Sequence, residues 1–130
     1  MQTVQRLAPE NTIYTNGAGN FAGWLHRFVR YHGLQHHGRT QLAPTSGAMG
    51  YGFPAAVGAA LLQPHRTVVN VAGDGDFLMT GQEMATATGY GANAADGRLV
   101  SIVVDNGTYG TIRMHQEREY PGRVSGSDLF

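Results

Sequence analysis

Two β-branched stretches and the loops after them decide the fold of this chain. The first is Thr67-Val68-Val69-Asn70-Val71-Ala72, followed by Gly73-Asp74-Gly75-Asp76; the second is Leu99-Val100-Ser101-Ile102-Val103-Val104, followed by Asp105-Asn106-Gly107-Thr108. Neither stretch alternates regularly with polar residues, which is typical of buried parallel strands. Between them, Thr80-Gly81-Gln82-Glu83 fits a capping box and predicts a helix to about Tyr90. A right-handed crossover then brings the carboxyl ends of both strands to one sheet edge.

The loops at that edge carry oxygen ligands suited to a hard cation. Neighbouring strands lie about 4.8 Å apart, so Asp74 and Asn106 can direct oxygens at one point. With the Thr108 carbonyl they would supply three protein oxygens, and Mg²⁺ usually completes its octahedron with water and phosphates. Taken alone, Gly-Asp-Gly is more simply a tight turn capped by its Asp. The two loops together predict a Mg²⁺ site and a phosphorylated ligand.

Segments on the amino-terminal side of these strands complete the predicted fold. Residues 12–15 predict a short strand that runs into Asn16-Gly17-Ala18-Gly19, and the spacing of apolar residues predicts an amphipathic helix over 20–32, capped by Asn20. Residues 50–62 are apolar on every side, which is typical of an interior helix. We therefore predict one domain over residues 1–130, with a Rossmann-like three-layer α/β/α fold and a mostly parallel sheet.

Composition excludes several other classes of protein. The 130 residues, 42% of them hydrophobic, suffice for one core. Nine basic residues balance nine acidic ones, and only 14% of residues are charged against roughly 25% in ordinary domains, which argues against nucleic-acid or membrane-surface binding. The absence of Cys excludes disulfides and thiolate metal sites. Nothing resembles a signal peptide or a membrane span, so we expect a cytoplasmic protein.

Three segments carry a resemblance to a known family. Gly73-Asp74-Gly75 followed by Asp105-Asn106 resembles the Gly-Asp-Gly to Asn-Asn signature of thiamine-diphosphate-dependent enzymes. The segment Gly47-Ala48-Met49-Gly50-Tyr51-Gly52-Phe53-Pro54-Ala55-Ala56 resembles the glycine-rich entry to that family's interior helix. Gly17-Ala18-Gly19-Asn20 with Trp24 is similar to the turn that meets the diphosphate. Together they resemble the carboxyl-terminal, diphosphate-binding domain of the acetolactate synthase, benzoylformate decarboxylase and pyruvate decarboxylase group.

The resemblance implies a role for each matching residue. Asp74, the Asn106 side chain and the Thr108 carbonyl would bind Mg²⁺. Met49 matches the bulky residue that wedges beneath the cofactor, forces its V shape and brings the 4′-amino group close to the thiazolium C2. The residues that the resemblance places around the thiamine diphosphate are Gly19, Asn20, Gly47, Met49, Gly73, Gly75 and Asp76.

The chain departs from the family pattern at three places. Asp105 replaces the first Asn of the usual pair; we expect it to point away and cap the loop, although it could add charge to the metal site. Residues 91–97 resemble an insertion before the second strand. Asp76 occupies a position often held by a small residue, so its carboxylate must turn toward the helix start or the metal to avoid the diphosphate.

The resemblance also implies that this chain is half of a site. In the family, a Glu on the pyrimidine-binding domain of a second subunit protonates N1′ of the cofactor. Glu83 serves the predicted helix cap, and Glu117 and Glu119 lie in a polar stretch, so we assign no catalytic residue to this chain. We expect the chain alone to be inactive, the domain to continue beyond Phe130, and the full-length parent to be a homo-oligomer, dimeric or tetrameric.

Other conspicuous residues have simpler interpretations. Adjacent His36 and His37 suit a solvated loop better than a transition-metal site, and His115 suits a surface helix better than a substrate contact. Arg113 could meet a substrate carboxylate or an interdomain acid, or could face solvent. Three large apolar side chains are expected in the core: Trp24, Phe28 and Met84.

The preferred function is therefore that of a Mg²⁺–thiamine-diphosphate-binding domain. Its parent would make or cleave a carbon–carbon bond next to a carbonyl, with the thiazolium ylid as nucleophile, as an acetolactate synthase-like or 2-oxoacid decarboxylase-like enzyme. Two alternatives stay open: a stand-alone small subunit completed by a separate pyrimidine-binding chain, and a Mg²⁺-dependent phosphoryl-transfer enzyme that would use Asp74 and Asp76 as nucleophile and acid.

Overall fold

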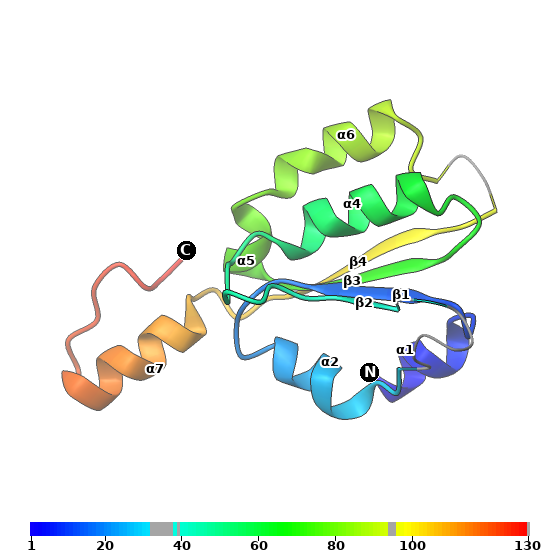
Figure 1. The fold of residues 1–130 in the computed structure, drawn as a ribbon. Coiled ribbons are helices and arrows are strands. Elements are labelled where there is room, and N and C mark those ends of the chain that lie inside the picture. Colours follow the sequence, from blue (N-terminus) through cyan, green and yellow to red (C-terminus); the bar gives the residue numbers. More distant parts are fainter. Residues whose placement is uncertain (32–37, 39, 94–95, 130) are drawn as a thin grey trace.

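A computed structural model describes residues 1–31, 38, 40–93 and 96–129. Four strands form one sheet, with α1 and α2 on one face and α4 and α6 on the other (Figure 1). The elements, in chain order, are α1 (Gln2–Leu7), β1 (Ile13–Asn16), α2 (Ala22–Phe28), β2 (Gln41–Leu42), α4 (Gly52–Leu62), β3 (Val68–Gly73), α5 (Asp74–Leu78), the short 3-10 helix η1 (Gly81–Glu83), α6 (Met84–Gly89), β4 (Leu99–Val104) and α7 (Gly110–Glu119). The predicted three-layer α/β/α architecture is confirmed.

The strand order in the sheet is β2-β1-β3-β4, and every neighbouring pair is parallel. The central strand β3 pairs on both sides, with Val68 opposite Ile13 of β1 and opposite Leu99 of β4. Every residue of β3 is buried. Because the strands are parallel, β1, β3 and β4 all end at the same edge of the sheet, as the sequence predicts.

Two apolar clusters pack on the two faces of the sheet. On the α4 face, Ile13 and Val68 pack with Ala56 and Ala60 of the helix. On the α2 face, the buried side chains are Tyr14, Leu25, Val29, Val69 and Val71. Successive side chains of a strand point to opposite faces, which is why neighbouring residues of β3 serve different clusters.

A buried polar network crosses the sheet beneath the start of α4. Asn70 of β3 is fully buried; its Oδ1 accepts from Thr15 Oγ1 at 3.1 Å, and its Nδ2 donates to Ser101 Oγ at 2.8 Å. Thr15 Oγ1 also lies 2.9 Å from the carbonyl oxygen of Gly52. Because these groups satisfy one another, three strands and a helix are tied together at little desolvation cost.

Strand β4 differs from the prediction of a buried strand. Within the described residues it is the last strand of the sheet, paired only with β3. Val100, Val103 and Val104 are therefore exposed, at 44%, 41% and 43%. The apolar composition of the stretch predicted its strand conformation correctly but did not reveal that it lies at an edge.

Two of the three side chains predicted for the core lie at the surface instead. Trp24 is 61% exposed and Met84 is 55% exposed, whereas Phe28 is half-buried and stacks on Trp24. Helix α2 spans only Ala22–Phe28, shorter than the predicted 20–32, and is not capped by an Asn20 side chain. Ala22 and Leu25 form its buried face, so Trp24 points elsewhere.

The segment after β3 also differs from the predicted loop and capping box. A helix, α5, begins at Asp74 directly after the strand. Thr80 makes no cap hydrogen bond; its hydroxyl donates instead to the Gly50 carbonyl oxygen at 2.8 Å. Glu83 accepts from Thr86 Oγ1 at 2.6 Å rather than capping the helix. The capping-box prediction was wrong because the Thr80 hydroxyl bonds to Gly50 and the Glu83 carboxylate bonds to Thr86 instead.

Some predictions fall outside the described residues. His36 and His37 are among these, as is part of the predicted insertion at residues 91–97. In the part of the chain that is described, no helix is long and apolar enough to cross a membrane.

Replacing Gly52 by Ala is expected to destabilise the fold by about 1–3 kcal/mol, because a small-to-large change in a packed interior forces neighbours apart. An added Cβ would lie 2.5 Å from the backbone nitrogen of Gly17 and 2.7 Å from Asn70 Oδ1. Gly58→Ala in the same helix is the matched control, since its Cβ would meet nothing within 4 Å. There, helix propensity predicts a gain of up to about 1 kcal/mol. Equal midpoints of urea denaturation for the two variants would contradict this packing.

Candidate functional site

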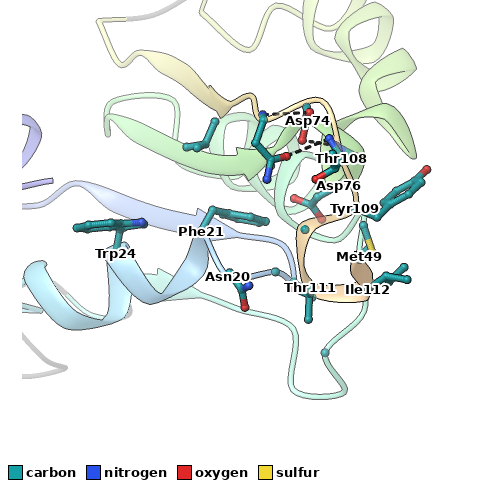
Figure 2. A pocket seen from close by; sticks show the side chains of 18 residues that line it. Asn20, Phe21, Trp24, Met49, Asp74, Asp76, Thr108, Tyr109, Thr111 and Ile112 are labelled. Atoms are coloured by element: carbon teal, nitrogen blue, oxygen red, sulfur yellow. Dashed lines mark hydrogen bonds between the residues drawn. The ribbon is translucent and has the colours of Figure 1, made fainter. Parts of the chain in front are cut away.

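The carboxyl edge of the sheet holds a pocket of about 390 Å³. Four segments line it: the β1–α2 turn, the stretch before α4, the β3–α5 junction and the loop from β4 into α7. Figure 2 shows Met49 and Trp24 well apart along it, with Asp74 and Asp76 between them. All ten residues named from the sequence line this one pocket: Gly19, Asn20, Gly47, Met49, Gly73, Asp74, Gly75, Asp76, Asn106 and Thr108.

Asp74 joins the ends of β3 and β4. Its Oδ1 accepts from the Gly75 N–H at 3.0 Å, and its Oδ2 accepts from the Gly107 N–H at 2.8 Å and the Asn106 N–H at 3.3 Å. Burial alone would raise the pKa of the Asp74 carboxyl group. The bond from Gly75, the Asp105 side chain and the loop N–H groups outweigh burial, and the pKa of Asp74 is lowered. The carboxylate is thus held ionised at the pocket wall.

The β4–α7 loop is ordered by its own polar groups. Asn106 Oδ1 accepts from the Thr108 N–H at 3.1 Å, and the Thr108 carbonyl oxygen accepts from the Gly110 N–H at 2.9 Å. Asp105 Oδ1 accepts from the Gly107 N–H at 2.9 Å, so the prediction that Asp105 caps the loop is confirmed. Its side chain also interacts with Asp74 rather than pointing fully away.

Asp76 lies at the pocket wall with its carboxylate held by backbone N–H groups. The side chain is only 3% exposed, and its Oδ1 accepts from the Gly50 N–H at 2.7 Å. The N–H of Ala18 is a second donor. Burial raises the pKa of Asp76, although both N–H groups favour its charged form. A Cβ on Gly17 would lie 1.9 Å from this carboxylate, so Gly17 is required beside Asp76.

Two aromatic rings fill the space that glycines leave at the β3–α5 junction. A Cβ on Gly73 would lie 2.9 Å from Phe21, and one on Gly75 would lie 2.6 Å from Tyr109. Both rings line the pocket (Figure 2). Neither was predicted from the sequence to line the pocket, although each directly follows a predicted site residue, Asn20 or Thr108. Four more lining residues were not predicted from the sequence: Val104, Gly110, Thr111 and Ile112.

The other candidate catalytic groups lie elsewhere. His115 is exposed on α7, as predicted, and Glu117 and Glu119 are exposed on the same helix. Arg113 is not a free group facing solvent: its Nε donates to Ser127 Oγ at 2.8 Å, and its guanidinium pairs with Asp128.

The segment that Arg113 holds lies against the loop that carries Thr108. The Tyr109 N–H donates to the Ser127 carbonyl oxygen at 2.8 Å, and the Leu129 N–H donates to the Gly107 carbonyl oxygen at 2.9 Å. An isolated antiparallel bridge pairs Thr108 with Asp128. Arg113 therefore supports the pocket wall indirectly.

The arrangement defines a class of protein: a parallel α/β domain with an oxygen-rich ligand pocket at the carboxyl edge of its sheet. Comparison with known proteins agrees. Residues 17–129 match the family model "Thiamine pyrophosphate enzyme, C-terminal TPP binding domain". This chain belongs to that family of thiamine-pyrophosphate-binding domains.

Individual relatives are named as acetolactate synthases. The chain is 37% identical over 117 residues to the "Probable acetolactate synthase large subunit" of Methanocaldococcus jannaschii, covering 89% of this chain and 18% of that protein. It is 33% identical over 135 residues to the "Acetolactate synthase large subunit" of Lactococcus lactis, covering 93% of this chain and 22% of the relative. The same-named subunit of Corynebacterium glutamicum is 34% identical over 131 residues, with coverages of 99% and 19%. The chain thus spans about a fifth of the length of these relatives.

The lowered pKa of Asp74 predicts how stability changes in acid. A carboxyl group whose folded pKa is below its unfolded value of about 3.9 stabilises the fold above that pH, and the contribution is lost as pH falls through the folded pKa. Asp74→Asn should therefore flatten the loss of unfolding free energy below about pH 4. Urea denaturation of both proteins across this range measures it; parallel curves would contradict the assigned environment of Asp74.

Proposed function

We propose that this pocket holds Mg²⁺ and the diphosphate of thiamine diphosphate, and that the chain is the cofactor-binding part of an acetolactate synthase-like enzyme. The observation that carries the proposal is that four separate segments bring all ten motif residues to one pocket at the sheet edge. The names of the relatives support an acetolactate synthase-like enzyme over a simple decarboxylase.

The oxygen donors at this edge fit a magnesium ion. A carboxylate offers about four lone-pair positions, and the Asp74 carboxylate accepts three backbone N–H groups. The Asn106 side-chain oxygen and the Thr108 carbonyl oxygen each accept one backbone N–H and keep a second lone pair. A carboxylate, an amide oxygen and a carbonyl suit Mg²⁺, which takes its remaining ligands from water and phosphate. In our proposal these three residues bind the metal.

The diphosphate would lie between the β1–α2 turn and the start of α5. Gly19 and Asn20 border it from one side, and Gly73 and Gly75 from the other. Asp76 would shape this space without offering its carboxylate to the phosphates, because that carboxylate accepts from backbone N–H groups and is buried. Repulsion between the Asp76 carboxylate and the negatively charged phosphates is thereby reduced.

Thiamine diphosphate, when bound, supplies a nucleophilic carbon and an electron sink for bond changes next to a carbonyl. The residues of this chain would orient and hold it. Met49 lies half-buried on the pocket wall and would support the bent cofactor, with Gly47 contacting the aminopyrimidine. The activating Glu would come from a pyrimidine-binding domain of a second subunit, so we expect a homo-oligomer and an inactive isolated chain. We also expect the protein to be cytoplasmic.

Phosphoryl transfer is a weaker alternative for this pocket. That reaction needs an acid free to reach the phosphate, and Asp76, the candidate for the role, is 3% exposed and bonded to Gly50. A stand-alone small subunit remains an outcome of testing: turnover restored by adding a separate pyrimidine-binding chain would support it.

Replacing Asp74 by Ala should reduce the Mg²⁺-dependent affinity for thiamine diphosphate at least ten-fold, about 1.4 kcal/mol, because the charged metal ligand is lost. Calorimetry on the full-length protein, with and without EDTA, measures the change. Trp24, the single Trp of the chain, lines the pocket and gives a second, fluorescent readout.

Asp96→Ala is the matched control for this measurement. Asp96 pairs with His65, both side chains are 78% exposed, and neither lines the pocket. The control should bind as the wild type does. Unchanged affinity in Asp74→Ala would remove the metal assignment.

Replacing Met49 by Ala should slow exchange of the C2 proton of bound thiamine diphosphate about ten-fold or more, because a less constrained bend loses proximity between the reacting groups. Mg²⁺ affinity should not change. Proton NMR in deuterated buffer follows the exchange, and Met84→Ala, exposed on α6 outside the pocket, is the control. A wild-type exchange rate in Met49→Ala would exclude the supporting role of Met49.

A further inference from the structure

One residue next to Met49 has both of its backbone polar groups held by a single distant segment. The Gly50 N–H donates to Asp76 Oδ1 at 2.7 Å, in a buried hydrogen bond. The Gly50 carbonyl oxygen accepts from Thr80 Oγ1 at 2.8 Å. Asp76 lies in α5, and Thr80 lies two residues after that helix ends. The segment 76–80 therefore hydrogen-bonds to both backbone polar groups of Gly50.

The backbone conformation and the surroundings of Gly50 both favour glycine at this position. Its φ is +80°, a conformation that favours glycine. A Cβ at Gly50 would lie 3.1 Å from the Met79 Cβ and 3.1 Å from the Thr80 Cγ2, so the two backbones approach closely. Gly47, with φ +67°, lies on the other side of Met49. Met49 is therefore in an irregular stretch between two glycines, outside any strand or helix.

Helix α5, which contains Asp76, also carries the proposed metal ligand. Asp74 is the first residue of α5, and Asp76 accepts from Ala18 in the β1–α2 turn as well as from Gly50. Figure 2 places Asp74, Asp76 and Met49 around one space. Residues 74–80 thus contact the turn proposed to meet the diphosphate and the stretch that bears Met49, and they include the proposed metal ligand.

From these contacts we propose that Thr80 is a positioning residue for the reaction: together with Asp76, it fixes Gly50 and thereby the placement of Met49 against the cofactor. The inference rests on the proposed function. Thr80 itself does not line the pocket. It acts through its hydroxyl on the Gly50 carbonyl, whereas Asp74, the proposed metal ligand, is held by the N–H groups of Gly75, Asn106 and Gly107.

Thr80→Val tests the proposal, because it removes the hydroxyl and keeps the size of the side chain. In the full-length protein with Mg²⁺ and thiamine diphosphate, we expect C2 proton exchange to slow about five-fold or more, with diphosphate affinity within about two-fold of wild type. Thr80→Ser, which keeps the hydroxyl, should restore exchange. Thr88→Val is the matched control, since among the described residues the Thr88 hydroxyl bonds to carbonyl oxygens of its own helix, at Met84 and Ala85.

A second readout does not depend on the cofactor. With ¹³C-methyl-labelled methionine, the five Met residues of this chain each contribute one methyl signal, and the Met49 signal is assigned by Met49→Leu. We expect Thr80→Val to shift or broaden the Met49 signal in the protein without cofactor, and Thr80→Ser and Thr88→Val to leave it in place. If Thr80→Val does not fold, Thr80→Ala is measured in the same way.

The outcomes separate this inference from the proposed function. A wild-type protein that binds no thiamine diphosphate would overturn the function, while the Met49 signal still reports the coupling. A wild type that binds, combined with Thr80 variants whose Met49 signal and exchange rate are unchanged, would overturn only the role of Thr80. Slow exchange in Thr80→Val that Thr80→Ser does not restore would likewise overturn it.

Discussion

The pocket depends on one carboxylate that joins the ends of two parallel strands. Asp74, at the end of β3, accepts N–H groups from its own helix and from the loop after β4. These hydrogen bonds lower the pKa of the Asp74 carboxyl group despite its burial, and they fix the loop that carries Asn106 and Thr108. Parallel pairing brings the loops to one edge, and the hydrogen-bonded Asp74 carboxylate joins two of them there.

The rest of the pocket follows from close backbone approaches around that anion. Gly17 leaves room for the Asp76 carboxylate, and Gly52 lets α4 pack directly on β1. Two aromatic rings, Phe21 and Tyr109, occupy the space left by Gly73 and Gly75. The many glycines of this chain therefore serve contacts within the protein as much as contacts with a ligand.

The fold could be predicted from the sequence because its signals are local. The β-branched stretches at 67–72 and 99–104 define strands, and the parallel crossover rule joins them at one edge. The convergence of the site residues followed from that rule and from short motifs. The order of the strands and the edge position of β4 could not be predicted, since both depend on pairings between distant residues.

The errors came from residues with more than one available partner. Thr80 and Glu83 have the spacing of a capping box, but tertiary contact with Gly50 and a bond within the helix are made instead. Trp24 has helical spacing with apolar neighbours, yet the smaller Ala22 and Leu25 face the sheet. Asp76 differs again, because no local pattern reveals that its carboxylate meets N–H groups of two other loops.

The amide side chain of Asn70 has a consequence for how the chain folds. If β3 paired one residue out of step, Asn70 would turn to the opposite face, away from the Thr15 and Ser101 hydroxyl groups and toward a cluster that includes Leu25 and Val29. A shifted register would therefore bury the Asn70 amide without its native hydrogen-bond partners, which costs free energy. The hydrogen bonds of Asn70 therefore favour the native register, in which the loops after β3 and β4 meet at one edge.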